Sequence, residues 1–172
     1  MIATPMLRIY LLRHARAVWA EPGTRDFDRA LDARGREDAR ALGLEMAAKD
    51  LRPDRVICSS AKRCRETWDL LAEALPVSDV TFTETLYVEG QAGYLDIIQD
   101  LEDTGSVMLV GHNPMIEDTT AALLERDGGT IGAELRRGFP TCGLAIIDLT
   151  NAASGMSARK ATLHAFLKPV EA

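Results

Sequence analysis

The chain has few cysteines, histidines and aromatic residues, no long apolar run and no excess of positive charge, and these absences argue against several classes of protein. Its 172 residues include three histidines and three cysteines, and aromatic residues make up 5% of the chain. Three cysteines without a CxxC pair do not suggest a disulfide framework. No apolar run approaches the length of a membrane-spanning helix, and the N-terminal residues lack the basic-then-apolar pattern of a signal peptide. The formal net charge of −6 argues against general nucleic-acid binding, which uses a basic surface.

These features favour a soluble cytoplasmic protein with no membrane and no nucleic-acid partner. A length of 172 residues with 47% hydrophobic content is sufficient for one well-filled core, so we predict one domain over residues 1–172. The sequence shows no internal repeat and no low-complexity tract. Arginine is unevenly spread, with twelve of the sixteen in the first 65 residues, so a local anion site is compatible with the acidic total.

Apolar strand-like segments alternate with amphipathic helical ones, which is typical of an α/β fold. Helices are predicted after Asp32, after Ser59-Ser60, around residues 94–101 and after Asn113-Pro114. Asp32, Ser59 or Ser60, and Asn113 are the predicted helix caps. The hairpin-like connection over residues 151–160 predicts an antiparallel edge to the sheet. The predicted strands are residues 7–12, 55–58, 80–83, 107–110, 144–149 and 161–167.

Two of the three histidines come directly after predicted strands. Arg13-His14 follows the first strand, and His112 follows the strand that ends at Val110. Ligands of open parallel sheets bind beyond the carboxyl ends of the strands. Arg63 lies one turn into the helix that follows another strand, near an N-terminus that favours anions. The joint placement predicts one dianion pocket built from Arg13, His14, Arg63 and His112.

This residue set suits phosphoryl transfer, which relies on positioning and cationic stabilisation. A neutral imidazole can attack phosphorus and form a phosphohistidine, and a guanidinium fork matches phosphate oxygens. We therefore expect a neutral His14 and a protonated His112. Taken singly, His112 is compatible with a capped turn and Arg63 with a solvated helix residue. The other cations and the third histidine are interpreted as surface or structural residues: Arg16, Arg25, Arg29, Arg65 and His164.

Five segments are similar to those of a known family: Leu12–Ala15, Arg29–Gly35, Ser59–Thr67, Val110–Pro114 and Phe139–Ala145. Through them the chain resembles the histidine phosphatase (phosphoglycerate mutase-like) superfamily and, within it, the SixA-type phosphohistidine phosphatases. The resemblance implies a three-layer α/β/α sandwich with a mostly parallel sheet and no metal or organic cofactor. It also implies that His14 is the nucleophile and that Arg13, Arg63 and His112 hold the phosphoryl group, with Asn113 outside this set.

One position departs from the pattern of many superfamily members. Val88 falls where a carboxylate would protonate the leaving group, and Glu84 or Glu89 would replace it only if the register slips. A general acid contributes about 10²–10⁴-fold, so its absence penalises esters with poor leaving groups. Protonated imidazole leaves readily, and the departure therefore favours a phosphohistidine substrate.

The sequence thus predicts a phosphatase that removes phosphate from a protein phosphohistidine through phospho-His14. Two alternatives stay open. One is a phosphatase of the same superfamily that acts on a small phosphorylated metabolite, with Glu84 or Glu89 as the acid. The other is a phosphate-binding module without turnover, against which the complete set of two histidines and two arginines argues.

Overall fold

The computed structural model describes residues 5–102, 105–126, 131–151 and 159–171. A six-stranded sheet runs through the molecule in the order β3-β2-β4-β1-β5-β6. Strands β1 to β4 pair in parallel, whereas β5 is antiparallel to both β1 and β6. This confirms a mostly parallel sheet with an antiparallel edge. The strands are β1 (Met6–Arg13), β2 (Arg55–Ser59), β3 (Asp79–Thr83), β4 (Gly105–Gly111), β5 (Leu144–Asn151) and β6 (Arg159–Leu167).

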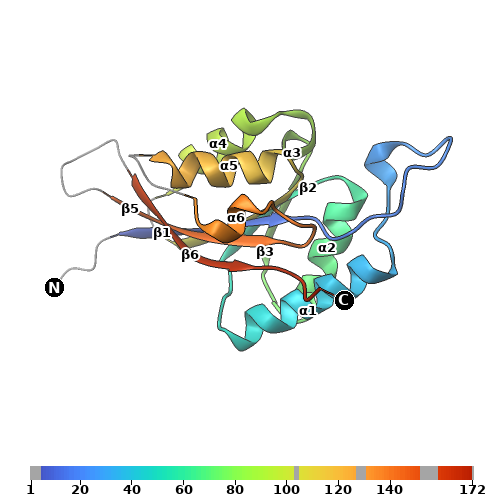
Figure 1. Cartoon of the computed structure of the whole chain (residues 1–172), viewed down its shortest axis with the longest axis horizontal. Coiled ribbons are helices and arrows are strands. Elements are labelled where there is room, and N and C mark those ends of the chain that lie inside the picture. Colours follow the sequence, from blue (N-terminus) through green and yellow to red (C-terminus); the bar gives the residue numbers. More distant parts are fainter. Residues whose placement is uncertain (1–4, 103–104, 127–130, 152–158, 172) are drawn as a thin grey trace.

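Helices cover both faces of the sheet, which confirms the three-layer α/β/α sandwich (Figure 1). One face carries α1 (Ala33–Ala48) and α2 (Lys62–Ala72). The other face carries α3 (Thr85–Val88), α4 (Gln91–Gln99), α5 (Met115–Leu124) and α6 (Ala133–Arg136). A short 3₁₀ helix, η1 (Asp26–Asp28), lies in the loop between β1 and α1.

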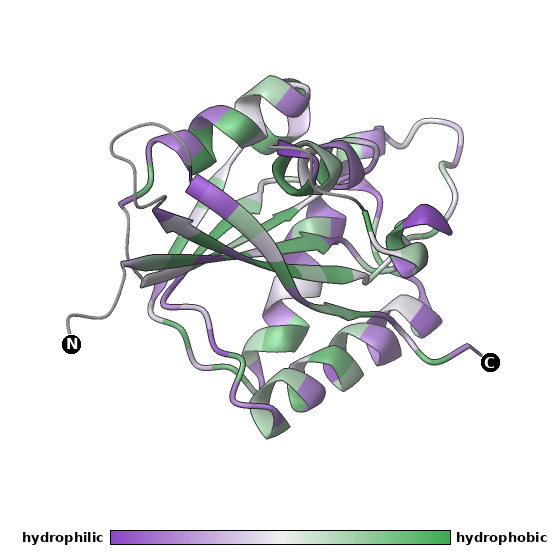
Figure 2. Ribbon diagram, turned by 60° about the vertical axis from the view of Figure 1, so that its left-hand side comes forward, coloured by the Kyte–Doolittle hydropathy of each residue, from purple (hydrophilic) through white to green (hydrophobic). Residues whose placement is uncertain are grey.

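The two cores follow from the alternation of side chains along each strand. In β1, Tyr10 and Leu12 pack under α1 and α2, whereas Ile9 and Leu11 pack under the helices of the opposite face. Because both faces are covered, the buried stretches of the central strands, such as residues 9–12 and 107–110, are runs of hydrophobic residues rather than an alternation with polar ones. Figure 2 shows these hydrophobic strands between the two helical layers.

Of the predicted caps, the structure confirms Asp32, whose carboxylate accepts a hydrogen bond from the backbone N–H of Gly35 at 2.7 Å. The others are wrong. Helix α2 begins after Ala61 without a side-chain cap, because Ser59 still belongs to β2 and its hydroxyl contacts His112 instead. Pro114 occupies the cap position of α5, and the Asn113 amide donates to Glu117 and to a backbone carbonyl.

The short helices α3 and α6 were not predicted, because four residues are too few to establish a helical period. The pairing of β5 with β6 is antiparallel, as predicted. Most of the predicted hairpin connection, residues 152–158, lies outside the described residues. In the part of the chain that the structure describes, every helix is too short or too polar to cross a membrane.

Candidate active site

The carboxyl ends of three neighbouring parallel strands bring the predicted residues to one edge of the sheet. Arg13 pairs with Gly111, so that His14 and His112 follow directly at the ends of adjacent strands. The backbone N–H of His14 donates to the carbonyl of Gly111, and the His14 carbonyl accepts from the N–H of Cys142, both at 3.0 Å. The main chain of the nucleophile candidate is therefore held by β4 on one side and by the loop before β5 on the other.

His112 is positioned by a buried tyrosine. The backbone N–H of His112 donates to the Tyr94 hydroxyl at 3.1 Å, and that hydroxyl donates to the carbonyl of Leu86 at 2.8 Å. A Cβ atom on Gly111 would lie 2.1 Å from the same hydroxyl oxygen. Glycine is required before His112 because any side chain there would displace Tyr94.

Arg63 lies at the centre of the site. Its Nε–H donates to Nε2 of His14 and one Nη2–H donates to Nδ1 of His112, both at 3.2 Å. The two imidazole rings have centroids 5.4 Å apart. Helix α2 is tied to the end of β1 through Thr67, which accepts from the N–H of Ala15 at 3.0 Å and donates to the Arg63 carbonyl at 2.7 Å. The structure thus brings His14, Arg63 and His112 into direct contact, as predicted.

Arg63 also determines the tautomers of both histidines, because a guanidinium can only donate hydrogen bonds. Nε2 of His14 must accept from it, and Nδ1 of His14 donates to the carbonyl of Ala15 at 2.7 Å. Nδ1 of His112 must likewise accept, so its Nε2–H donates to the Ser59 hydroxyl at 2.8 Å. His14 therefore presents an unprotonated Nε2, which is the form that a nucleophile requires.

Burial and neighbouring positive charge keep both rings neutral. Desolvation, with the charges of Arg63, Arg13 and Arg29, lowers the pKa of His14 to about 4. Desolvation and Arg63 lower the pKa of His112 to about 3. The expected neutral His14 agrees with these values. The expected protonated His112 does not hold for the free site, because the adjacent guanidinium opposes a second positive charge.

Arg13 lies beside this group without joining its hydrogen bonds. Its Nη1 donates to the carbonyl of Phe139 at 2.7 Å, and its Nε is buried without a hydrogen-bond partner. The positive charge of Arg13 contributes to the lowered pKa of His14. A buried donor without a partner, next to the nucleophile candidate, is available to an oxygen of a bound anion.

Asp26 and Tyr87 belong to the site and were missed by sequence reasoning. The Asp26 carboxylate accepts from Nη2 of Arg63 and from the Tyr87 hydroxyl, both at 3.0 Å. Partial burial acts to raise the pKa of Asp26, but Arg29, Arg63 and Tyr87 outweigh it and hold the pKa at about 2. Arg29, interpreted above as a surface or structural charge, thus supports the site through Asp26. No periodicity marks an aspartate in a loop, so the sequence offers no signal for it.

The alternative acids Glu84 and Glu89 do not contact the predicted residues. Both side chains are exposed, and within the described residues neither carboxylate forms a hydrogen bond or an ion pair. They flank α3, which instead turns Tyr87 toward His112 with ring centroids 5.5 Å apart. Val88, on the same helix, is 68% exposed. Residues 84–89 thus border the site as the sequence indicated, but the side chain that they place there is the phenol of Tyr87 and not a carboxylate.

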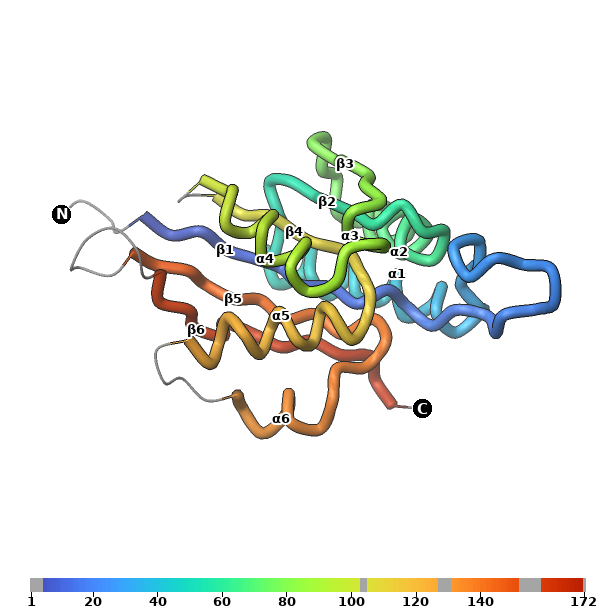
Figure 3. Tube along the Cα trace, turned by 90° about the horizontal axis from the view of Figure 1, so that it is seen from above, coloured from blue at the N-terminus to red at the C-terminus, as the bar shows by residue number. Residues whose placement is uncertain are grey.

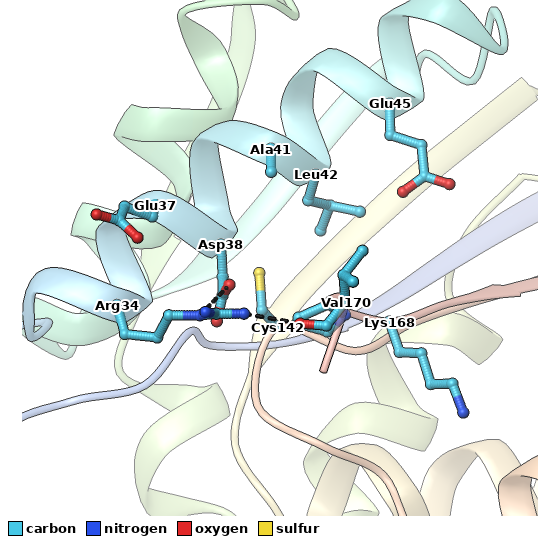
Figure 4. Close-up of a pocket in the computed structure, with 10 residues that line it drawn as sticks. Arg34, Glu37, Asp38, Ala41, Leu42, Glu45, Cys142, Lys168 and Val170 are labelled. Carbon is cyan, nitrogen blue, oxygen red and sulfur yellow. Dashed lines mark hydrogen bonds and ion pairs between the residues drawn. The ribbon is translucent and has the colours of Figure 1, made fainter. Parts of the chain in front are cut away.

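A separate cavity of about 260 Å³ lies between α1 and the segment that follows β6 (Figure 4). Cys142 lines it, together with an Arg34–Asp38 ion pair at 2.8 Å. Burial raises the pKa of the Cys142 thiol to about 12. This cavity contains none of the predicted phosphate ligands. Across the described ranges, no three His, Cys, Asp or Glu side chains come together as a metal site.

Comparisons with known proteins agree with this geometry. The model of the histidine phosphatase superfamily (branch 1) matches residues 9–87. A candidate phosphohistidine phosphatase SixA from Agrobacterium tumefaciens is 38% identical, with a TM-score of 0.82 over 98% of this chain and 100% of that chain. A second candidate SixA, from Nakamurella multipartitia, is 27% identical, with a TM-score of 0.79 over 96% and 98% of the two chains.

A curated relative covers a similar range. An uncharacterized protein of Mycobacterium tuberculosis is 29% identical over 139 residues, which are 79% of this chain and 85% of the relative. The likeness to the Agrobacterium structure spans both chains almost completely. The chain belongs to the histidine phosphatase superfamily.

Proposed function

We propose that the chain is a phosphohistidine phosphatase that acts through a phospho-His14 intermediate. Membership of the superfamily supports phosphatase activity. The observation that carries the mechanism is the tautomer of His14: Nδ1 donates to the Ala15 carbonyl at 2.7 Å, so Nε2 is unprotonated. Its lone pair accepts from Arg63 in the free site and attacks phosphorus once that guanidinium binds phosphoryl oxygens instead. A pKa near 4 keeps this nitrogen unprotonated at neutral pH.

In the first step, Nε2 of His14 bonds to phosphorus while the P–N bond of the substrate phosphohistidine breaks. The bonding electrons leave with the substrate imidazole, which departs as a neutral ring because its other nitrogen already carries a proton. In the second step, water attacks phosphorus, the bond to Nε2 breaks, and inorganic phosphate and neutral His14 are formed. Both steps place phosphoryl oxygens where Arg13 and Arg63 offer positive charge, so the mechanism uses guanidinium groups rather than a metal ion.

His112 serves this mechanism in two protonation states. In the free site its Nδ1 accepts from Arg63. A bound phosphoryl dianion places negative charge beside His112, where the free site has only the positive charge of Arg63. The dianion therefore raises the pKa of His112 and favours a second proton, on Nδ1. The ring then donates to a phosphoryl oxygen, while Ser59 continues to hold the Nε2–H.

The choice of phosphohistidine over an ester rests on the leaving group. Neither Glu84 nor Glu89 contacts the site, and Asp26 has a pKa near 2, so it is ionised and holds no proton to donate. An alkoxide leaving group lacks the help that a general acid provides, worth about 10²–10⁴-fold. An imidazole that is already protonated leaves without that help.

The test measures turnover, without added metal, of a folded domain phosphorylated on histidine and of a panel of phosphate esters. We expect selective loss of phosphohistidine phosphate by the wild type and none by His14→Ala. The matched control is His164→Ala, because His164 lies on β6 and contacts Asp148 rather than the site. Preferred turnover of one ester, lost on replacing Glu84 or Glu89, would instead identify a metabolite phosphatase. Phosphate binding without turnover of any substrate would identify a binding module.

A further inference from the structure

Three exposed apolar side chains lie on the two segments that supply Asp26 and Tyr87 to the site. The loop between β1 and α1, residues 15–32, carries Val18 and Trp19, which are 41% and 90% exposed. Helix α3 carries Val88, which is 68% exposed. We call these three residues the apolar rim. Among the described residues, the other exposed large hydrophobic side chains are Met6, Leu44, Phe82 and Val170.

Trp19 is exposed although the loop around it is held by hydrogen bonds. The N–H of Val18 donates to the Ala30 carbonyl at 2.9 Å, and its carbonyl accepts from Nε of Arg29 at 2.9 Å. Ala17 and Leu31 form an antiparallel bridge. The N–H of Leu31 donates to the Glu66 carboxylate of α2 at 2.7 Å. The residues next to Trp19 are therefore fixed by hydrogen bonds, although the Trp19 side chain itself is exposed.

Other residues of the same loop contact the site residues. The Asp26 carbonyl accepts from Nη1 of Arg63 at 2.7 Å, and the Phe27 ring packs edge-on against Tyr87 with centroids 5.0 Å apart. Figures 1 and 3 show the loop projecting beyond the body of the fold, at the blue end of the colour scale. The inner residues of the loop thus lie against the site residues, while Trp19 is exposed to solvent.

The distance along the chain agrees with a protein partner. Trp19 follows His14 by five positions, so the two Cα atoms lie at most about 18 Å apart. A standard protein interface buries about 800 Å² per partner, which corresponds to a disc of about 16 Å radius. A protein interface of this size centred on His14 therefore extends to the neighbourhood of Trp19. Tryptophan is among the residues that contribute most to such interfaces.

The charged side chains of the loop do not favour a partner of either charge. The loop pairs its exposed arginines internally, Arg16 with Asp32 and Arg25 with Asp28. The charged side chains of residues 16–32 are three arginines and four carboxylates. Attraction to an acidic or a basic segment is therefore weak, and apolar contact remains as the source of affinity.

We propose that the apolar rim is a docking surface for the folded protein that carries the phosphohistidine, with Trp19 as its main contact. This inference rests on the proposed function and identifies the substrate as a protein domain rather than a phosphorylated metabolite. The partner presents an apolar patch beside its phosphohistidine, so that Trp19 is buried while the phosphoryl group enters the site.

The experiment compares the wild type with Trp19→Ala on three substrates: a folded domain phosphorylated on one histidine, a peptide with the same phosphohistidine, and para-nitrophenyl phosphate. The matched control is Leu44→Ala, a 65% exposed residue of α1. We expect Trp19→Ala to lower kcat/KM for the domain about 10-fold through KM, with less effect on the peptide and none on the ester. The control should match the wild type on all three, and KM for the domain should change little with salt.

Other outcomes overturn the inference in distinct ways. Equal losses on all three substrates would show that Trp19 is a structural or lid residue. Unchanged turnover of the domain would show that the apolar rim does not dock it. A wild-type dimer that Trp19→Ala dissociates, measured by sedimentation, would assign the rim to a second copy of the chain. If the wild type hydrolyses esters but no phosphohistidine, the proposed function fails and this inference fails with it.

Discussion

The ends of β1 and β4 each supply one histidine to the site, but they hold it by different means. Arg63 bonds to both rings, but the other contacts of His14 are with main-chain groups: its ring donates to the Ala15 carbonyl and its backbone bonds to Gly111 and Cys142. His112 is held by side chains, with its ring on Ser59 and its backbone N–H on Tyr94. The orientation of His14 is therefore insensitive to most single substitutions, whereas that of His112 can be altered without touching the histidine.

The largest expected effect separates the two histidines directly. His14→Ala removes the nucleophile and should lower kcat by at least about 10⁴-fold, since removing a nucleophile costs up to about 10⁶-fold in other enzymes. His112→Ala removes one donor to the phosphoryl group and should cost about 10²–10³-fold. Single-turnover assays with a phosphohistidine substrate measure both losses. Equal losses for the two variants would contradict the division of roles.

The next effect tests the residue that joins the two strand ends. Arg63→Lys keeps the charge but cannot donate to both histidines at once, so kcat/KM should fall about 10²-fold. Arg65→Lys on the same helix is the control, because Arg65 bonds to the Ser60 carbonyl and stacks on Phe82. A fully active Arg63→Lys variant would show that positive charge alone is sufficient at this position.

The pH dependence provides a smaller effect with a definite sign. The pKa values of His14 and His112 lie near 4 and 3 in the fold, against about 6.5 when unfolded. The unfolded chain thus binds protons first, so the free energy of unfolding should decrease as pH falls from about 6.5 to about 4. Ring NMR titration should show both histidines neutral at pH 5. His112→Asn should weaken the pH dependence of stability, and a ring that titrates near pH 6.5 would contradict the burial argument.

The smallest effect sharpens the contrast between main-chain and side-chain support. Ser59→Ala removes the acceptor for the His112 Nε2–H and should lower kcat several-fold, about the loss of one neutral hydrogen bond. The ring NMR signals of His112 should shift, while those of His14 stay in place. Ser60→Ala is the control, because the Ser60 side chain has no hydrogen bond among the described residues. Equal shifts at both histidines would show that the strand ends are coupled more tightly than their contacts indicate.

Much of the site could be predicted because the residues follow strands. His14 and His112 stand at the ends of apolar runs, and parallel strands place such ends together. Arg63 follows the same logic one turn into a helix. Asp26 and Tyr87 could not be found this way, since one lies in a 3₁₀ turn and the other in a helix of four residues. Asp26 reaches Arg63 because the loop folds back over α2, and Tyr87 reaches Asp26 and Arg63 from the separate helix α3.

The wrong caps have a similar origin. Ser59 and Asn113 have side chains that commonly cap helices, and local sequence cannot indicate that another strand or loop will use them. The Ser59 hydroxyl bonds to His112, which is 53 residues away. The Asn113 NH2 donates to Glu117 and to the Phe139 carbonyl, and its Oδ1 accepts no helix N–H. Asp32, with a local partner three residues ahead, was predicted correctly.

The sequence by itself determined the alternation of strands and helices and the two histidines and two arginines at or just after strand ends, whereas the mostly parallel sheet was implied by the resemblance to a family. The first two depend on hydrophobic period and on the side-chain types that suit phosphate, which are local properties. The tertiary structure decided which nitrogen of each histidine is free, which charges lower their pKa values, and which side chain of α3 faces the site. Those properties arise from contacts between distant segments, because protonation depends on the hydrogen bonds and burial that only the folded chain supplies.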